Sequence, residues 1–229
     1  MKKKAVIIFS GGQDSTTCLA IAKQKGYECF ALTFDYGQKH KYEIEAAKKI
    51  ANQFNVNHKI IDVKAIGELG GSALTDSDLS VENQKNLKSK TVPSTYVPAR
   101  NTVFLSIALA YAEVINANCI YIGVAKDDHM YYPDGRPSFI SAFQSVINEG
   151  TKSSMEGGEG IEVITPLMNM SKSEMIVKGL GLGINYYDTV TCYNLTENGL
   201  ACGDCHSCYL RKQGFESAGV EDQTNYQYV

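Results

Sequence analysis

The sequence predicts an α/β protein with a Rossmann-like, doubly wound and mostly parallel sheet of five strands. Short apolar runs alternate with stretches of helical length and period along most of its 229 residues. The connections between these runs are long enough to hold the crossover that parallel strands require. A glycine-rich turn at residues 11–12 joins the first apolar run directly to the first helical stretch, as in doubly wound sheets that bind nucleotides.

The expected elements are placed by their apolar runs and by their start and stop signals. Gly26 suits the position after a helix C-terminus, and Ser171 with Glu174 three residues later predicts a capping box. In chain order we expect a strand at 4–9, a helix at 15–25, a strand at 28–34, a helix at 40–54, a strand at 58–63, a helix at 101–114, a strand at 119–124, a helix at 138–148, a strand at 162–165 and a helix at 171–180.

Three segments depart from this alternation. Residues 64–98 form an insertion of a length that usually indicates function. Residues 150–160, rich in glycine and glutamate, are expected to form a flexible loop, and from residue 185 the chain is expected to be loop-like. The helix at 101–114 is almost uncharged, which predicts that it is buried. We divide the chain into an α/β domain over 1–184 and a cysteine-rich segment over 185–229.

The composition excludes several classes of protein. A net charge of -3 gives no strong electrostatic footprint for nucleic acid. No apolar stretch reaches the 18 residues of a membrane span, and the first apolar run is too short for a signal peptide. We therefore expect a cytoplasmic protein, in a reducing compartment that disfavours structural disulfides.

The run Ser10-Gly-Gly-Gln-Asp-Ser15 predicts an anion site, because it lies between a strand and a helix start. The helix start presents unpaired N–H groups and a positive dipole end, and glycines let a phosphate approach the backbone. A simple connecting turn is the alternative. No Gly-Lys-Ser/Thr follows, so this is not a Walker loop. The loops at 35–37 and 125–136 are expected at the same edge of the sheet, where ligands bind in such folds.

The run resembles the loop with which the PP-loop ATP pyrophosphatases hold the pyrophosphate end of ATP. That resemblance implies ATP contacts from the loop and from a residue of the second strand. These residues are Phe9, Ser10, Gly11, Gly12, Gln13, Asp14, Ser15, Thr16 and Thr33. Asp14 could hold the loop or help to organise Mg²⁺, which prefers carboxylate and phosphate oxygens.

Four cysteines near the C-terminus predict a structural tetrahedral zinc site. Their spacing is C-x9-C-x2-C-x2-C, formed by Cys192, Cys202, Cys205 and Cys208. His206 is left out, because four thiolates already complete the coordination shell. An iron–sulfur cluster uses the same ligands, and disulfides are the other alternative. A closed zinc site would do no chemistry and would stabilise a segment that lacks its own core.

Further segments together resemble the QueC family of 7-cyano-7-deazaguanine synthases, whose fold is of the adenine nucleotide alpha hydrolase type. The matching pieces follow the order of the family along almost the whole chain. They are 9–18 (FSGGQDSTTC), 34–38 (FDYGQ), 93–98 (PSTYVP), Arg100, Asn101, 132–134 (YPD), 165–167 (TPL), Lys172, 191–193 (TCY) and the cysteine cluster through Arg211.

The resemblance implies an ATP-dependent C–N ligase of queuosine and deazapurine biosynthesis. It would convert 7-carboxy-7-deazaguanine and ammonia to 7-cyano-7-deazaguanine through an acyl-adenylate and an amide, releasing AMP and pyrophosphate. It implies ATP, Mg²⁺, one structural Zn²⁺ and a homodimer. Ser10, Asp14, Ser15 and Lys172 would be the catalytic residues, although Lys172 alone could be an ordinary solvated lysine.

The resemblance also implies contacts to substrate from two regions of the chain. Arg100 would meet negative charge on substrate or ATP, whereas Asn101 could equally cap the helix that follows. The rest come from the loop after the fourth strand, which could instead be a surface turn. The implied substrate residues are Arg100, Asn101, Tyr132, Asp134 and Arg136, and Asp127, Asp128 and His129 are weaker candidates.

The chain departs from the family pattern near the implied substrate pocket. Ala99 stands where the family has glycine, Gly135 where it has cysteine, and residues 125–130 are unlike the usual sequence. These changes leave open a ligase that stops at the amide, or one that couples the carboxylate to another amine or to a protein. A PP-loop enzyme that modifies tRNA, and a zinc-stabilised nucleotide-binding module without activity, are more distant alternatives.

Overall fold

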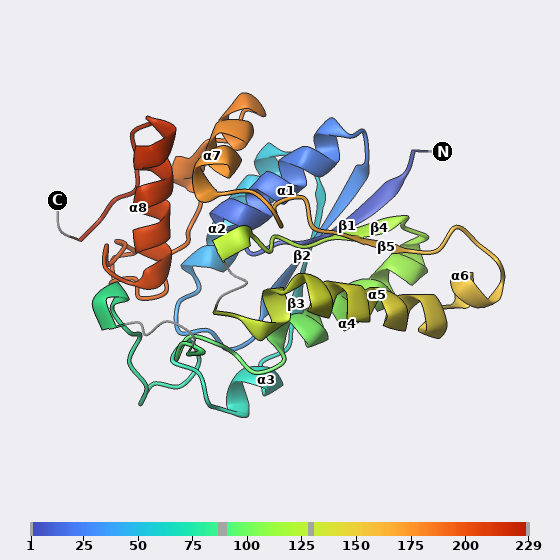
Figure 1. The fold of residues 1–229 in the computed structure, drawn as a ribbon, viewed down its shortest axis with the longest axis horizontal. Coiled ribbons are helices and arrows are strands. Elements are labelled where there is room, and N and C mark those ends of the chain that lie inside the picture. The colour runs from blue at the N-terminus through green and yellow to red at the C-terminus, as the bar shows by residue number, and fades with distance from the viewer. Residues whose placement is uncertain (1, 87–90, 128–130, 228–229) are drawn as a thin grey trace.

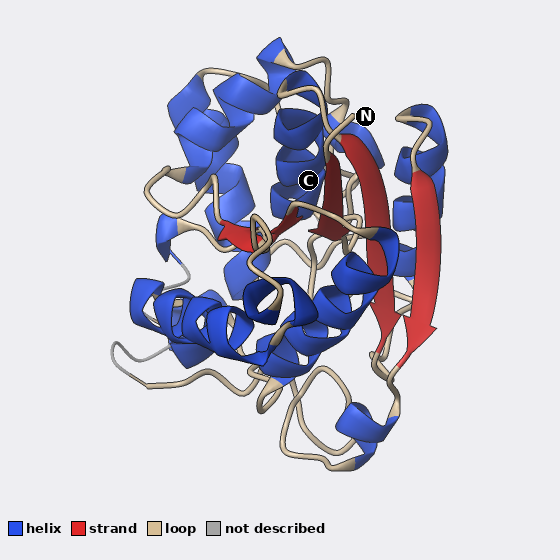
Figure 2. Cartoon of the chain, turned by 90° about the vertical axis from the view of Figure 1, so that its right-hand side faces the viewer, coloured by secondary structure: helices blue, strands red, loops and turns tan. Residues whose placement is uncertain are grey.

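The computed structural model describes residues 2–86, 91–127 and 131–227. Its five strands form one sheet in the order β3-β2-β1-β4-β5, and every neighbouring pair is parallel, which confirms the predicted sheet (Figures 1 and 2). The strands are β1 (Lys4–Ile8), β2 (Glu28–Asp35), β3 (Asn57–Asp62), β4 (Cys119–Tyr121) and β5 (Glu162–Ile164). The strand order reverses between β1 and β4, so the switch point lies beside the end of β1.

Helices cover both faces of the sheet (Figure 1). Alternate residues of β1 explain the two layers: Ala5 and Ile7 pack with α1, α2, α7 and α8, whereas Val6 and Ile8 pack with α4 and α5. The helices are α1 (Gln13–Gln24), α2 (Tyr42–Gln53), α3 (Ala65–Glu68), α4 (Arg100–Ile115), α5 (Pro137–Gly150), α6 (Lys152–Met155), α7 (Lys172–Gly181) and α8 (His206–Ala218).

The lack of charge in helix α4 predicted a buried helix. In the structure the helix is buried on one side only. One face, which includes Phe104 and Leu105, packs on the sheet. The opposite side is exposed enough that Val114 keeps 77% of its surface. The prediction failed because a helix beside a sheet is buried on one side only, and apolar residues elsewhere on its surface are common.

The segment from residue 185 onward contains helix α8, which the sequence did not predict. The helix carries few apolar residues, so its period is weak, and its packing on α7 fixes it instead (Figure 1). A Cβ on Gly214 would lie 2.8 Å from Cβ of Lys172 and 2.9 Å from Cδ1 of Ile176. Only glycine lets the two helices approach this closely.

The other loops also differ in part from expectation. Residues 150–160 contain the short helix α6, in which the Thr151 hydroxyl accepts a hydrogen bond from the N–H of Ser154 at 3.3 Å. Part of the insertion at 64–98 joins the C-terminal segment: the N–H of Gln84 donates to the Asp204 carbonyl at 2.9 Å. Among the described residues, no helix is long and apolar enough to cross a membrane.

A buried ion pair anchors α8 to the rest of the C-terminal segment. Arg211 is 2% exposed, and its Nε donates to both carboxylate oxygens of Asp222 at 3.1 and 3.2 Å. Its other nitrogens donate to the Thr189 hydroxyl at 2.8 Å and to the Tyr186 carbonyl at 2.9 Å. One side chain therefore joins three parts of this segment.

Replacement of Arg211 by Met is expected to lower the free energy of unfolding by about 3–5 kcal/mol, because it leaves the Asp222 carboxylate buried without its partner. Burial raises the pKa of Asp222, but the charge of Arg211 and the hydrogen bonds from Tyr226 and Thr224 together outweigh burial, and the net shift is downward. The stabilisation is thus present above the unfolded pKa and is lost as the pH falls through the folded pKa. Urea unfolding at pH 7 and pH 3, with Lys212→Met as control, measures both effects; equal midpoints for Arg211→Met and the parent protein at pH 7 would contradict the prediction.

Candidate active site and metal centre

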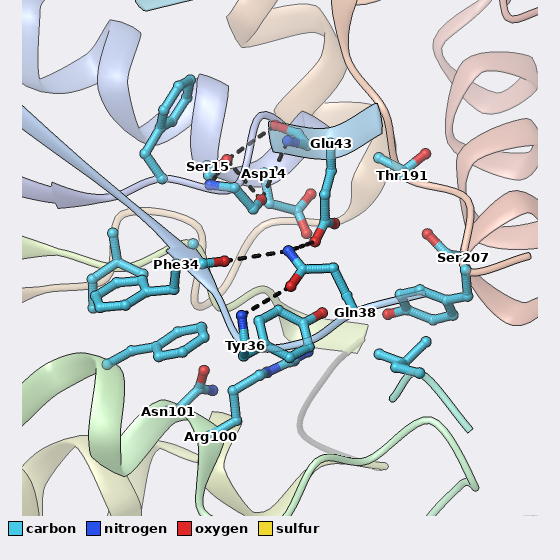
Figure 3. Close-up of a pocket in the computed structure, with 18 of the residues that line it drawn as sticks. Asp14, Ser15, Phe34, Tyr36, Gln38, Glu43, Arg100, Asn101, Thr191 and Ser207 are labelled. Carbon is cyan, nitrogen blue, oxygen red and sulfur yellow. Dashed lines mark hydrogen bonds between the residues drawn. The ribbon is translucent and has the colours of Figure 1, made fainter. Parts of the chain in front are cut away.

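A cavity lies at the carboxyl ends of β1, β2 and β4, the edge at which the sequence predicted a ligand site (Figure 3). Most of the predicted ATP-binding residues line it: Phe9, Ser10, Gly12, Gln13, Asp14, Ser15, Thr33 and Arg100. Gly11, Thr16 and Lys172, which were also predicted, are not among the residues that line it. Four predicted substrate or metal residues, Asn101, Tyr132, Asp134 and Cys192, line the same cavity.

The loop between β1 and α1 is held by its own hydroxyl groups. The hydroxyls of Ser10 and Ser15 are 3.1 Å apart, and the Ser10 N–H donates to the Ser15 hydroxyl at 3.2 Å. Gly12 donates its N–H to the Ser10 hydroxyl, also at 3.2 Å. Ser15 lies within the first turn of α1, which begins at Gln13 rather than at residue 15 as predicted. The loop therefore presents hydroxyl groups beside the positive end of a helix.

Gly11 is required by the packing of α2 on the loop. Its φ is +79°, and a Cβ there would lie 2.5 Å from the backbone nitrogen of Ala47. A side chain would push α2 away from the loop. Gly11 thus sets the position of α2, whose first turn borders the cavity.

Two polar groups of α1 are buried without a hydrogen-bond partner among the described residues: the Gln13 side-chain amide nitrogen and the Thr16 hydroxyl. Gln13 is 2% exposed and lines the cavity. A buried donor without an acceptor costs about 1–3 kcal/mol, so this amide is suited to donate to a bound molecule. The Thr33 hydroxyl, in contrast, is already bonded to the Phe9 carbonyl at 2.6 Å and to His58 at 2.7 Å.

An ion pair joins the loop to α7. Nζ of Lys172 donates to both oxygens of Asp14, at 2.9 and 2.7 Å, and the side chains are 11% and 26% exposed. The two residues come from segments 158 positions apart. The sequence had placed both near phosphate, and the structure brings them together beside the loop.

Arg100, Asn101 and Asp134 form the opposite wall of the cavity. Asp134 is buried, and its carboxylate accepts the backbone N–H of Asn101 at 3.2 Å. The Asn101 side chain donates to the Asp134 carbonyl at 3.0 Å, within helix α4 rather than at its cap. The Arg100 guanidinium lies over the Tyr36 ring, 5.6 Å from its centre. Arg136 is exposed and does not line the cavity.

The remaining candidates of the loop after β4 are placed in part. The Tyr132 hydroxyl lies 2.8 Å from the Thr95 hydroxyl, which belongs to the insertion. Asp127 does not line the cavity. Asp128 and His129 lie outside the described residues.

Ala99 occupies the N-cap of α4 with φ 57° and ψ 15°, a left-handed conformation. The sequence anticipated strain if the backbone here needed positive φ, and the structure confirms the conformation. Ala in this region costs about 1–2 kcal/mol.

Ala99→Gly removes the strain of a side chain at positive φ, but it also gives the unfolded chain more freedom, which offsets about 0.4–1 kcal/mol of that gain. We therefore expect the variant to be more stable by about 1 kcal/mol or less. Ala99→Val should lower stability, because a β-branched side chain fits positive φ worse. Thermal unfolding of the three proteins measures the order, and a Val variant as stable as the Gly variant would disprove the strain.

Gln38 and Glu43 line the cavity but were not among the predicted site residues. The Gln38 amide nitrogen donates to the Phe34 carbonyl at 3.2 Å and to Oε1 of Glu43 at 2.8 Å, and its oxygen accepts the Tyr36 N–H at 2.9 Å (Figure 3). A signal existed in the sequence. Glu43 shares the helical face of buried Ala47 and Ile50, at spacings of four and seven residues, which is an unusual place for a carboxylate.

The four predicted metal ligands converge. The sulfur atoms of Cys192, Cys202, Cys205 and Cys208 all lie within 4.8 Å of one another, and all four residues are buried. Two of the separations are 3.5 and 3.9 Å, close to the value of about 3.8 Å expected between thiolates at 2.3 Å from one tetrahedral ion. All four are free cysteines in the structure, with no disulfide among them.

His206 stands apart from the sulfur cluster, as predicted. Its Nδ1 lies 2.5 Å from Oε1 of Gln84, and its ring meets that of Tyr131 edge-on. The backbone N–H groups of Asn194 and Cys202 donate to the Cys192 sulfur at 3.3 Å. Such donors favour the thiolate form that binds a metal.

Comparisons with known proteins point to one family. The family model described as "Queuosine biosynthesis protein QueC" matches residues 4–219. The 7-cyano-7-deazaguanine synthase of Coxiella burnetii is 54% identical over 225 residues, 98% of each chain. The synthases of Saccharophagus degradans, 51% identical over 98% of each chain, and Pseudomonas fluorescens, 48% identical over 98% of this chain and 99% of that protein, are also similar.

Solved structures are similar in fold. A 4-thiouridine synthetase, in complex with RNA and bound ATP, aligns with a TM-score of 0.52 and 19% identity over 82% of this chain and 42% of that one. The NMN synthetase of Francisella tularensis aligns with a TM-score of 0.51 and 14% identity over 97% and 79%. These likenesses support the predicted fold class.

Proposed function

Because the chain belongs to the QueC family, we propose that it is an ATP-dependent C–N ligase that makes 7-cyano-7-deazaguanine from 7-carboxy-7-deazaguanine and ammonia, in queuosine biosynthesis. The single observation that carries the proposal in the structure is the cavity, where the phosphate loop and the Arg100–Asp134 wall face one space.

The chemistry explains why ATP is needed twice. A carboxylate does not react with ammonia, because its oxygen is a poor leaving group. Attack of the carboxylate on the α-phosphate gives an acyl-adenylate and pyrophosphate, and ammonia then displaces AMP to form the amide. A second adenylation, on the amide oxygen, allows AMP to leave and the nitrile to form. Both adenylations join a weak oxygen nucleophile to AMP, so one site serves both.

We assign the phosphate loop to the pyrophosphate end of ATP. The hydroxyls of Ser10 and Ser15, with the N–H groups at Gly11 and Gly12, would hold the leaving pyrophosphate. The unpartnered Gln13 amide would gain an acceptor on ATP. Lys172 would add positive charge at the same end. In this arrangement the catalytic set is Ser10, Asp14, Ser15 and Lys172.

We assign the opposite wall to the deazaguanine. Arg100 would bind the substrate carboxylate or the charge that develops at the α-phosphate. Asp134 would accept N–H groups from the guanine-like face, and Asn101 and Tyr132 would border the ring. Arg136 would reach the site only if its exposed side chain turned inward.

We further propose one Zn²⁺ on the four thiolates and Mg²⁺ bound with ATP. The donor set suits zinc, whose shell four cysteines close, so zinc would stabilise the C-terminal segment and do no chemistry. Mg²⁺ takes mainly phosphate oxygens and waters in nucleotide sites. Because Asp14 already forms an ion pair with Lys172, we favour the role in which Asp14 holds the loop over the role in which it helps to organise Mg²⁺.

We expect the reaction to take place in the cytoplasm, where ATP is present and thiolates stay reduced. We also expect a homodimer, since the outer side of α4 offers apolar surface around Val114. Light scattering of the parent protein and of Val114→Lys tests that association. No stable complex with nucleic acid is expected from the net charge of -3, and a gel shift with bulk tRNA tests this.

The proposed function is tested by product analysis. The protein is incubated with ATP, Mg²⁺, ¹⁵N-ammonium and 7-carboxy-7-deazaguanine, and the products are followed by mass spectrometry. We expect the ¹⁵N-nitrile with two AMP formed for each. A ¹⁵N-amide as the end product, with one AMP, would support the ligase that stops early. Unchanged substrate would overturn the assignment to deazaguanine.

A further inference from the structure

The proposed reaction needs ammonia with a free lone pair at the acyl carbon. At neutral pH it is present in water mainly as ammonium, which has no lone pair and cannot attack an acyl-adenylate. One proton must therefore leave the nitrogen first. A group that accepts this proton must lie within hydrogen-bond reach of the nucleophile, with a pKa near the working pH.

Three carboxylates line the cavity among the residues that the structure describes. Asp14 accepts both hydrogen bonds from Lys172, at 2.7 and 2.9 Å, and is neutralised by it. Asp134 accepts the N–H at the start of α4 and lies in the field of Arg100. Both carboxylates thus already have polar or charged partners. Glu43 is the third, and no lysine or arginine that the structure describes forms an ion pair with it.

Hydrogen bonds around Gln38 fix the direction in which the Glu43 side chain points. Gln38 is buried, and its bonds to the Phe34 carbonyl and the Tyr36 N–H orient its amide so that the nitrogen faces Glu43. The Glu43 side chain extends from the first turn of α2 into the cavity toward Gln38 (Figure 3). The bond from Gln38 uses Oε1, so Oε2 of this cavity-lining residue is not taken by Gln38.

We propose that Glu43 is the base that converts bound ammonium to ammonia, and that Gln38 is the residue that positions it. The step is balanced: the Glu43 carboxylate takes one proton, and the freed nitrogen lone pair forms the C–N bond to the acyl carbon. The C–O bond to AMP breaks with its electron pair on AMP. The adduct and Glu43 then lose one proton each to solvent. The inference rests on the proposed function.

The partial burial of Glu43 in the cavity wall favours both parts of this step. A half-buried carboxylate attracts a cation, and proton transfer then turns an ion pair into two neutral molecules, which a low-dielectric site prefers. Burial raises the pKa of Glu43 to about 7, although the Gln38 hydrogen bond and the charge of Arg100 act to lower it. Burial and the charge of Glu43 raise the pKa of the Tyr36 hydroxyl. At this pKa the carboxyl group accepts and returns a proton readily near neutrality.

Glu43→Gln tests the inference, because Gln keeps the size of the side chain and an acceptor for Gln38. We expect kcat/KM for ammonium to fall about 10²- to 10⁴-fold, the usual range for loss of a general base. Exchange of pyrophosphate into ATP, which depends on 7-carboxy-7-deazaguanine and needs no ammonia, should stay at the parent rate. Hydroxylamine, which has a free lone pair at neutral pH, should still give the hydroxamate.

Glu45→Gln is the matched control. Glu45 is exposed on the same helix, where it pairs with Lys48 at 2.7 Å, and the variant should keep the parent kinetics. Gln38→Ala should raise the apparent pKa in the pH profile of the reaction with ammonium, because it removes a hydrogen bond to the ionised Glu43 carboxylate. Normal ammonium kinetics in Glu43→Gln, or loss of exchange or of hydroxamate formation along with nitrile, would overturn the inference. Absence of exchange in the parent protein would instead overturn the proposed function.

Discussion

Replacing Lys172 by Ala is expected to slow adenylation about 10²- to 10³-fold, the usual cost of losing one preorganised group that stabilises developing charge. Lys172 is 11% exposed and is fixed by Asp14, so its position costs no reorganisation during the reaction. The loss should appear in kcat for pyrophosphate exchange more than in KM for ATP. If Lys172 were an ordinary solvated lysine, its replacement would change neither the rate of adenylation nor kcat for pyrophosphate exchange.

The Lys172 variant also leaves the Asp14 carboxylate partly buried without its partner, so stability must be controlled. Lys172→Met combined with Asp14→Asn removes both charges and should recover stability without recovering activity. Lys178→Ala, in the last turn of the same helix, should behave as the parent protein. Full exchange activity in the folded double variant would show that the pair has a structural role only.

Replacing Cys208 by Ser is expected to abolish stoichiometric zinc binding and to unfold the C-terminal segment. Structural zinc contributes on the order of 10 kcal/mol to small cysteine sites, and the cluster packs with few other apolar residues, such as Leu195 and Ala201. Activity should also be lost, since Thr191, Tyr193 and Ser207 line the cavity. The C-terminal segment thus contributes both to the cavity and to the cysteine cluster.

Metal content and limited proteolysis measure this outcome. The parent protein should hold one zinc per chain and resist cleavage after residue 185. Cys119→Ala removes a buried cysteine outside the cluster and should keep the full zinc content. Iron with inorganic sulfide in the parent protein, or a Cys208→Ser variant that retains one zinc, would contradict the assignment.

The sequence was sufficient where one local pattern determines one structure. The apolar run, the glycines and the helix start predicted the loop at 10–15, because a strand, a glycine turn and a helix start follow one another directly in the sequence. The cysteine spacing predicted the sulfur cluster for a similar reason: four thiolates within a short segment can meet at one ion. The alternation of strands and helices predicted the parallel sheet and the edge that carries the cavity.

The sequence was insufficient where distant segments decide the outcome. Helix α8 is fixed by α7 through the close contact at Gly214, and its own apolar pattern is weak. The Asp14–Lys172 pair depends on how α1 and α7 pack together on one face of the sheet. Glu43 had a detectable signal, a carboxylate on the buried face of α2, but only the fold shows that this face opens into the cavity at Gln38.

The fate of the substrate oxygens tests the central claim of two adenylations most directly. The protein is supplied with 7-carboxy-7-deazaguanine labelled with ¹⁸O at both carboxylate oxygens, and AMP is analysed by mass spectrometry. The account predicts two AMP per nitrile, each with one ¹⁸O, and no label in water or pyrophosphate. Label that remains in an amide, or that appears in water, would contradict formation of the nitrile through two adenylates.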